Sequence, residues 1–203
     1  FIYIITSILF AANTDPIIFI HGFMGWGRDE VEAYYYWGGD FDYESQLRSH
    51  NLQVYTASVG PLSSNWDRAI ELYTQIKGGC VDYGRSHSLN FGIIQKPNKC
   101  YEGIYPAWDS NHPVHLVGHS QGGSTARMLE YLLISVFHDE NSPLLSNSHS
   151  GWINSITSIS TPHNGTTLAS IMSSYIPFSQ KLSSLAGFVA PFVLSSCNFD
   201  LGQ

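Results

Sequence analysis

Charged side chains are scarce in this sequence: Asp, Glu, Lys and Arg together make up only 12% of its 203 residues. Nine Lys and Arg stand against 16 Asp and Glu, so the formal net charge is −7. Proteins that bind nucleic acid gather cations to neutralise backbone phosphates. The sequence has no such basic patch, and its composition argues against a nucleic-acid partner.

Long apolar runs are lacking as well. The opening stretch, residues 1–12 (FIYIITSILFAA), is apolar but too short to cross a bilayer, which takes about 20 residues. An apolar run that ends in small residues before a polar one, here Asn13, is typical of a secretory signal peptide, although a starting Met and basic residues are absent. A buried first strand is the alternative. We expect residues 1–12 to be a signal-peptide remnant, the protein to be secreted, and no transmembrane segment to be present.

Cysteines are few and odd in number. A pair formed by Cys80 and Cys100 would close a modest loop and would suit the oxidising compartment of an exported protein. Cys197 would then pair with a partner beyond residue 203 or remain a free thiol. The spacing matches no zinc-thiolate motif.

Hydrophobic residues are plentiful, at 43% of the chain, and include five Trp, twelve Tyr and eleven Phe. This content predicts a sizeable core, built as one α/β domain or a large part of one. Expected strands alternate with expected helices, which predicts a mostly parallel, doubly wound sheet whose ligands gather at the carboxyl ends of the strands. The strands are expected at 16–23, 52–60, 114–120 and 153–160, and the helices at 63–79 and 121–137. The polar stretch 138–150 predicts a surface loop.

A glycine-flanked serine lies between one expected strand and its helix. Residues 118–122 (GHSQG) fit G-x-S-x-G in the strand-to-helix context that this motif requires. Gly118 and Gly122 lack side chains where strand and helix would collide, and Gly123 lets the helix approach the sheet. The pattern predicts that Ser120 lies in a strained turn with its Oγ held out at the edge of the sheet.

Two backbone N–H groups complete the hypothesis of a nucleophilic serine. Gln121 begins the helix, so its N–H points to where an oxyanion would form. The second donor is expected from Phe23, in the HGF sequence after the first buried strand, with Gly22 allowing a sharp turn. A serine in such a turn can instead be a simple helix cap. The two signals together predict a serine acyl-transfer enzyme.

The sequence resembles the large secreted triacylglycerol lipases typified by Gram-positive bacteria. The resemblance covers residues 15–170 and rests on six segments: PIIFIHGFMGWGRDE, YYWGGD, YTASVGPLSSNWDRA, GGCVDYGRSH, GHSQGGSTARML and SISTPHNGTTLA. It implies an α/β-hydrolase with a zinc-supported region and a helical lid, and it assigns Ser120 as nucleophile and the N–H groups of Phe23 and Gln121 as the oxyanion hole. The apolar stretch 184–194 is consistent with a helix of the lid or of the acyl pocket; the alternative is a segment of the hydrophobic core.

The same resemblance implies which function to expect and what is missing. We expect hydrolysis of ester bonds in acylglycerols at an oil–water interface; the alternatives are an esterase or phospholipase of the same fold, or a noncatalytic acyl-binding homologue. The acid and histidine of the triad follow late strands in this fold. None of His138, His149 and His163 does so, which indicates that the chain, residues 13–203, is the amino-terminal part of the domain, truncated before those strands. His163 is interpreted as structural or pocket-lining, and His119 as a packing residue pointing away from the Ser120 Oγ.

Zinc is the one cofactor that the resemblance implies, in a structural site, and the hydrolysis of the ester itself needs no cofactor. Asp67 and His87 match the first two family ligands. At the position of the family's second histidine ligand, this chain has Ile93. The family's late aspartate ligand would fall near Gly202, two residues from Asp200. Structural zinc takes four ligands, so two alone hold it poorly.

Both matching residues also have ordinary structural roles. Asp67 follows Ser64 by three residues, where a carboxylate favours the first turn of a helix. His87 can be a hydrogen-bonded loop residue. The aromatic run 34–39 (YYYWGG) is similar to the aromatic surround of the family's zinc site; without the metal it is a packed cluster.

Overall fold

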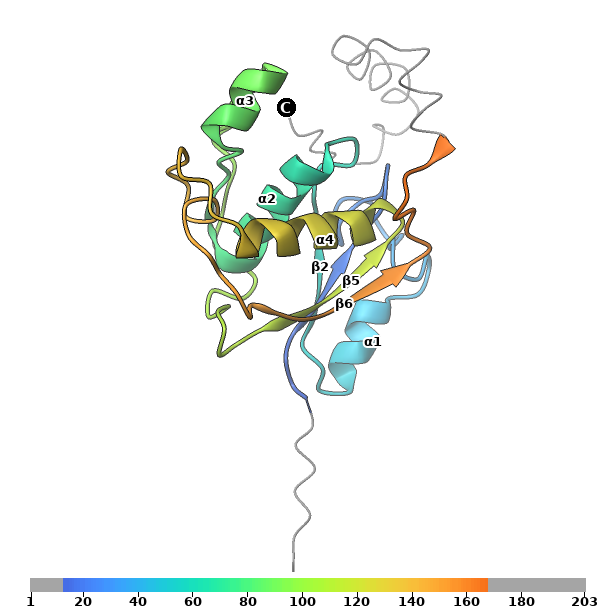
Figure 1. Cartoon of the computed structure of the whole chain (residues 1–203). Helices are drawn as coiled ribbons and strands as arrows, with labels where there is room; N and C mark the ends of the chain where they lie inside the picture. The colour runs from blue at the N-terminus through green and yellow to red at the C-terminus, as the bar shows by residue number, and fades with distance from the viewer. Residues whose placement is uncertain (1–12, 168–203) are drawn as a thin grey trace, which may run out of the picture.

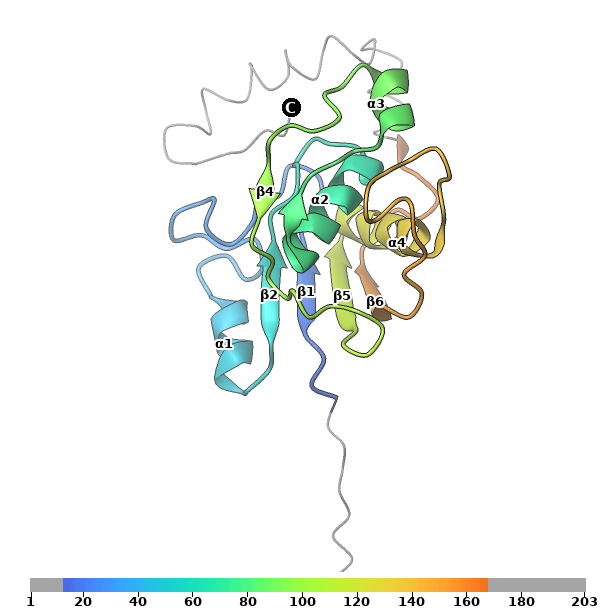
Figure 2. The same ribbon diagram turned by 90° about the vertical axis from the view of Figure 1, so that its left-hand side faces the viewer.

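A parallel sheet of four strands forms the centre of the structure, a computed structural model that describes residues 13–167 (Figure 1). The strands lie side by side in the order β2-β1-β5-β6 (Figure 2), and their bounds are Ile17–Ile20 for β1, Val54–Ala57 for β2, Val114–His119 for β5 and Ile153–Ile159 for β6. Each expected strand is therefore present. The signal peptide expected at 1–12, the stretch 184–194, Cys197 and Asp200 lie outside the described residues.

The two longest described helices cover one face of the sheet and pack against each other (Figures 1 and 2). They are α2, Asn65–Lys77, and α4, Gln121–Ile134. Helix α1, Tyr43–Ser49, lies on the other side, beside β2. The α/β class expected from the alternating pattern is confirmed. Within residues 13–167, no helix has the length and apolar character that crossing a membrane requires.

The core lies between this helix pair and the sheet. The continuous apolar run in β1 is central, because β1 pairs with β2 on one side and β5 on the other. In β5 the side chains alternate, with Val114 and Leu116 fully buried. Full burial of each large apolar side chain contributes roughly 1.5–3 kcal/mol, and α4 supplies Leu129 and Leu132 to this core.

The segment after α4 differs from expectation in two ways. The helix ends at Ile134 rather than at 137, because Ser135 is extended and the N–H of Phe137 donates to the Leu145 carbonyl. The stretch 138–150 is not merely a surface loop, since Leu144 and Leu145 are buried in the core. Its polar composition hid these two anchoring leucines.

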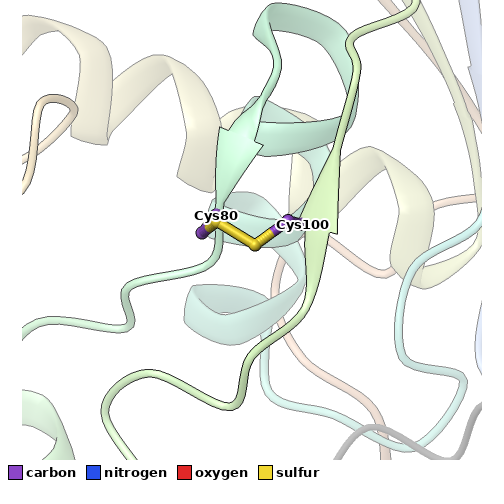
Figure 3. The surroundings of a disulfide bond; sticks show 2 residues. All are labelled: Cys80 and Cys100. Atoms are coloured by element: carbon purple, nitrogen blue, oxygen red, sulfur yellow. A yellow bond between two sulfur atoms is a disulfide. The ribbon is translucent and has the colours of Figure 1, made fainter.

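A small two-stranded sheet holds the segment that leads to α3, Arg85–Phe91. Strand β3, Gly79–Cys80, pairs antiparallel with β4, Cys100–Tyr101, and the predicted disulfide joins Cys80 to Cys100 directly across this pair (Figure 3). The intervening residues 81–99 are thereby closed into a loop whose ends are fixed, and α3 is carried on it.

Candidate active site

Ser120 lies at the junction of β5 and α4. Its backbone is in a strained conformation, with φ 53° and ψ −124°. A non-glycine residue in such a region costs about 1–3 kcal/mol, and the surroundings must enforce it. Two hydrogen bonds do so: the Ser120 N–H donates to the Ile159 carbonyl at 2.9 Å, and the Gly123 N–H donates to the Ser120 carbonyl at 3.2 Å.

Three glycines let neighbouring segments approach closely around this turn. A Cβ on Gly118 would lie 2.4 Å from the Gly122 carbonyl carbon, and one on Gly122 would lie 2.2 Å from the Ile20 oxygen. A Cβ on Gly123 would lie 2.1 Å from the Thr161 Oγ1. None of these glycines has a positive φ, so the close approach of neighbouring atoms, rather than an unusual backbone conformation, explains why each position requires glycine. The predicted role of all three is confirmed.

The loop after β1 lies directly against the serine. A Cβ on Gly22 would lie 2.8 Å from the Ser120 Cβ, while the φ of Gly22 is not in the left-handed region. The expected turn is present, because the Gly25 N–H donates to the Gly22 carbonyl at 3.1 Å, but the close approach to Ser120 rather than the turn's backbone conformation is what requires glycine. Within residues 13–167, neither Phe23 N–H nor Gln121 N–H donates to a protein acceptor. Both N–H groups that were predicted as oxyanion donors therefore lack an acceptor among the described residues.

His21 fixes the peptide group between Gly22 and Phe23, which carries the Phe23 N–H. The Val59 N–H donates to His21 Nε2 at 3.2 Å, so the neutral ring carries its proton on Nδ1 and donates it to the Gly22 carbonyl at 2.9 Å. The Gly25 N–H donates to the same carbonyl at 3.1 Å. Because a trans peptide directs its C=O and N–H to opposite sides, these two bonds fix the direction of the Phe23 N–H.

Arg68 of α2 supports the same loop with a buried positive charge. Its guanidinium donates to the carbonyls of His21 and Gly60 and to the Thr125 hydroxyl. Burial lowers the Arg68 pKa to about 10, so the group stays charged at neutral pH. Burial, and next the nearby Arg68 charge, lower the His21 pKa to about 3, which keeps that ring neutral.

Sequence reasoning assigned no role to either residue. An arginine on the apolar face of a helix that packs on a sheet is the signal that could have pointed to Arg68, because buried charges are rare unless they are paired.

The other histidines are not paired with the serine. Within residues 13–167, neither a histidine nor a carboxylate forms a hydrogen bond to the Ser120 hydroxyl. His163 lies in an exposed turn and His149 packs on Trp152. His119 does more than pack, since its Nδ1 lies 2.5 Å from the Tyr36 hydroxyl.

Comparison with known proteins identifies the family. Residues 13–183 match the family model described as "Lipase-like, C-terminal domain". The chain belongs to this lipase-like family. The expected resemblance to lipases of Gram-positive bacteria is confirmed.

Individual relatives agree with this membership. The chain is 43% identical over 170 residues to Lipase 2 of Staphylococcus aureus, covering 77% of this chain and 24% of that protein. Lipase 1 from Pelosinus fermentans is similar in structure, with 46% identity, a TM-score of 0.75, and coverage of 89% of this chain and 50% of that one. Staphylococcus hyicus lipase gives 37% identity, a TM-score of 0.78, and coverage of 89% and 49%. The chain thus spans about a quarter of the curated relative and about half of each solved structure.

The two residues that match the family's zinc ligands contact each other directly. His87 Nε2 lies 2.8 Å from Asp67 Oδ1, and the His87 ring stacks on Trp66 with centroids 5.0 Å apart. Asp67 lies in the first turn of α2, as expected, where its carboxylate accepts a hydrogen bond from the Ser64 hydroxyl and its N–H donates to the same hydroxyl of this N-cap residue. The first-turn position expected for Asp67 is confirmed, whereas His87 is hydrogen-bonded as expected but lies in helix α3 rather than in a loop.

The described residues do not fit a four-ligand zinc site. Ile93 packs on the core, and within residues 13–167 no three His, Cys, Asp or Glu side chains could hold a metal. The aromatic run 34–39 forms the packed cluster expected without a metal, in which the Tyr36 and Trp37 rings contact each other and lie against His119. Among described rings, His87 contacts only Trp66 and Phe91.

The buried neutral His21 predicts a specific loss of stability in acid. Its pKa is lowered in the folded state, so its contribution is fully present above the unfolded pKa of 6.5 and is lost as the pH falls toward 3. A pKa lowered from 6.5 to about 3 corresponds to about 5 kcal/mol. His21→Gln removes the titration, so its free energy of unfolding should fall less between about pH 7 and pH 4 than that of the parent.

Urea unfolding across this pH range checks the prediction. His50→Gln, at an exposed position after α1, serves as the control and should keep the parental pH dependence. Equal pH dependence in His21→Gln and the parent would show that His21 is not the group that titrates.

Proposed function

We propose that this chain carries the nucleophile and the oxyanion hole of a serine-dependent carboxylic ester hydrolase, a triacylglycerol lipase. The observation that carries the proposal is the placement of Ser120, in a strained turn, directly against the loop that contains Phe23. The N–H groups of Phe23 and of Gln121, the residue after Ser120, have no acceptor within residues 13–167. Such paired donors stabilise the tetrahedral oxyanion of acyl transfer.

The proposed fold is the α/β-hydrolase fold with its doubly wound sheet. The strand order β2-β1-β5-β6, the all-parallel pairing and the serine between β5 and α4 support it. In that fold the triad acid and histidine follow later strands, and we place them outside residues 13–167.

The proposed reaction follows from these groups. A histidine takes the proton of the Ser120 hydroxyl as Oγ attacks the acyl carbonyl, and the resulting oxyanion accepts hydrogen bonds from Phe23 N and Gln121 N. The alcohol leaves with that proton, and water then releases the fatty acid and regenerates the serine. No metal or organic cofactor is needed for either half-reaction.

The proposed substrate is an acylglycerol at an oil–water interface outside the cell. The relatives named lipases support this assignment. Rates of the complete protein on triolein, a short-chain ester and phosphatidylcholine test it: fastest turnover of triolein is expected, whereas a preference for the short-chain ester or the phospholipid would reassign the substrate to an esterase or a phospholipase.

Replacing the nucleophile is the direct test of the chemistry. In the complete protein, Ser120→Ala should abolish covalent labelling by an organophosphonate ester while the free energy of unfolding changes by less than about 1 kcal/mol, because one hydroxyl in a turn contributes little to packing. Mass spectrometry of the labelled peptide checks this result. Ser124→Ala, four residues along α4 and half-buried, is the matched control and should label normally. Labelling that persists in Ser120→Ala would overturn the assignment.

For the metal, we propose that the chain binds zinc weakly or not at all, because isoleucine occupies position 93 and leaves Asp67 and His87 as two ligands alone. Ile93→His adds a ligand that zinc prefers, so it should tighten zinc binding, whereas Ile94→His, at a position 60% exposed, should not. Zinc analysis after dialysis, combined with a competition titration, measures the difference. One tightly held zinc per unmodified chain would contradict the proposal and would require another ligand, such as His112 or Asp200.

A further inference from the structure

Tyr36 lies between the two segments that form the candidate active site. Its hydroxyl accepts a hydrogen bond from the Gly22 N–H at 2.9 Å and lies 2.5 Å from His119 Nδ1. Gly22 precedes Phe23, and His119 precedes Ser120. A single phenol oxygen therefore joins the loop that carries one proposed oxyanion donor to the turn that carries the nucleophile.

The protons can be assigned from the partners. The Gly22 N–H can only donate, so the Tyr36 oxygen accepts there and keeps its own proton for another bond. His119 Nδ1 is the second partner within reach, and the O–H donates to it when the neutral ring carries its proton on Nε2. Burial raises the Tyr36 pKa, which keeps the phenol protonated and able to donate.

The ring of Tyr36 is fixed on several sides. Trp26 and Trp37 meet it edge-on, with centroids 5.4 and 5.6 Å away, and the rings of His21 and His119 both lie 5.7 Å away. A phenol wedged in this way holds its oxygen in one place. Displacing it would release the Gly22 N–H and His119 together.

Tyr36 also completes a clamp on one peptide group. The His21 carbonyl and the Gly22 N–H belong to the same peptide; Arg68 donates to the carbonyl, and Tyr36 accepts from the N–H. The plane of this peptide is therefore held at both ends. The next peptide carries the Phe23 N–H, so its direction depends on this clamp as well as on His21 Nδ1.

We propose that Tyr36 is a positioning residue for the ester hydrolase: its hydroxyl sets the distance and orientation of the Phe23 N–H relative to Ser120 by binding Gly22 N and His119 Nδ1 at once. The inference rests on the proposed function. Tyr36 touches neither the nucleophile nor the oxyanion in this role, and acts through the two segments that it joins.

The test is the variant Tyr36→Phe in the complete protein, with kinetics normalised to the sites titrated by an organophosphonate. The ring remains and only the hydroxyl is lost, so the expected result is a decrease of about tenfold in kcat with KM changed by less than about twofold, because the oxyanion exists only in the transition state. The control is Tyr34→Phe, which removes the hydroxyl of a tyrosine two residues before Tyr36. The Tyr34 side chain is 47% exposed, so this variant should leave both kcat and KM unchanged.

A second pair of variants separates positioning from folding. The amide oxygen of His119→Asn can accept a hydrogen bond near the position of Nδ1, whereas His119→Leu offers no acceptor. The proposal predicts that His119→Asn retains severalfold more kcat per titrated site than His119→Leu. This comparison decides the matter if Tyr36→Phe fails to fold.

The outcomes distinguish this inference from the proposed function. If the parent is labelled at Ser120 and Tyr36→Phe keeps the parental kcat, or if His119→Asn and His119→Leu are equally active per titrated site, the positioning role is overturned while the hydrolase assignment stands. If the parent is not labelled at Ser120, the proposed function fails and the inference fails with it.

Discussion

No side chain fits between the start of α4 and the two strands behind it, and the rest of the candidate site depends on this backbone contact. The Gly122 Cα faces the Ile20 carbonyl so closely that a methyl group would lie 2.2 Å from it. Helix α4 can therefore begin immediately after β5, which forces Ser120 into its strained turn. The same proximity places the N-terminus of α4 beside the loop that follows β1, so nucleophile and donors converge from segments about 100 residues apart.

A buried polar layer then fixes the loop in place. Arg68, His21 and Tyr36 each bind a backbone group of residues 21–22, and all three are tied to other elements. Their placement is energetically demanding, because a buried cation is tolerated only when its donors are satisfied. This layer fixes the direction of the Phe23 N–H before any substrate arrives, and preorganised donors of this kind are what the proposed oxyanion hole requires.

The sequence predicts the four strands of the parallel sheet, helices α2 and α4, and the serine turn, because these leave local signals, whereas α1, α3 and the short strands β3 and β4 were not predicted. Alternating strand and helix patterns, and three glycines around Ser120, can be recognised without any knowledge of distant contacts. The burial of Arg68 leaves a sequence signal, but the backbone groups that Arg68 and Tyr36 bind could not be predicted, since they depend on which segments meet in space. For the same reason the sequence did not show that the cluster 34–39 packs against His119, and the buried Leu144 and Leu145 were hidden in a polar stretch.

The central claim is that two backbone N–H groups beside Ser120 form an oxyanion hole, and a crystal structure of the complete protein with an organophosphonate bound to the Ser120 Oγ tests it most directly. The phosphonyl oxygen stands in for the oxyanion of the tetrahedral intermediate. It should lie about 2.7–3.1 Å from both Phe23 N and Gln121 N. A phosphonyl oxygen that points to solvent, or that binds other donors while these two N–H groups remain unused, would contradict the account.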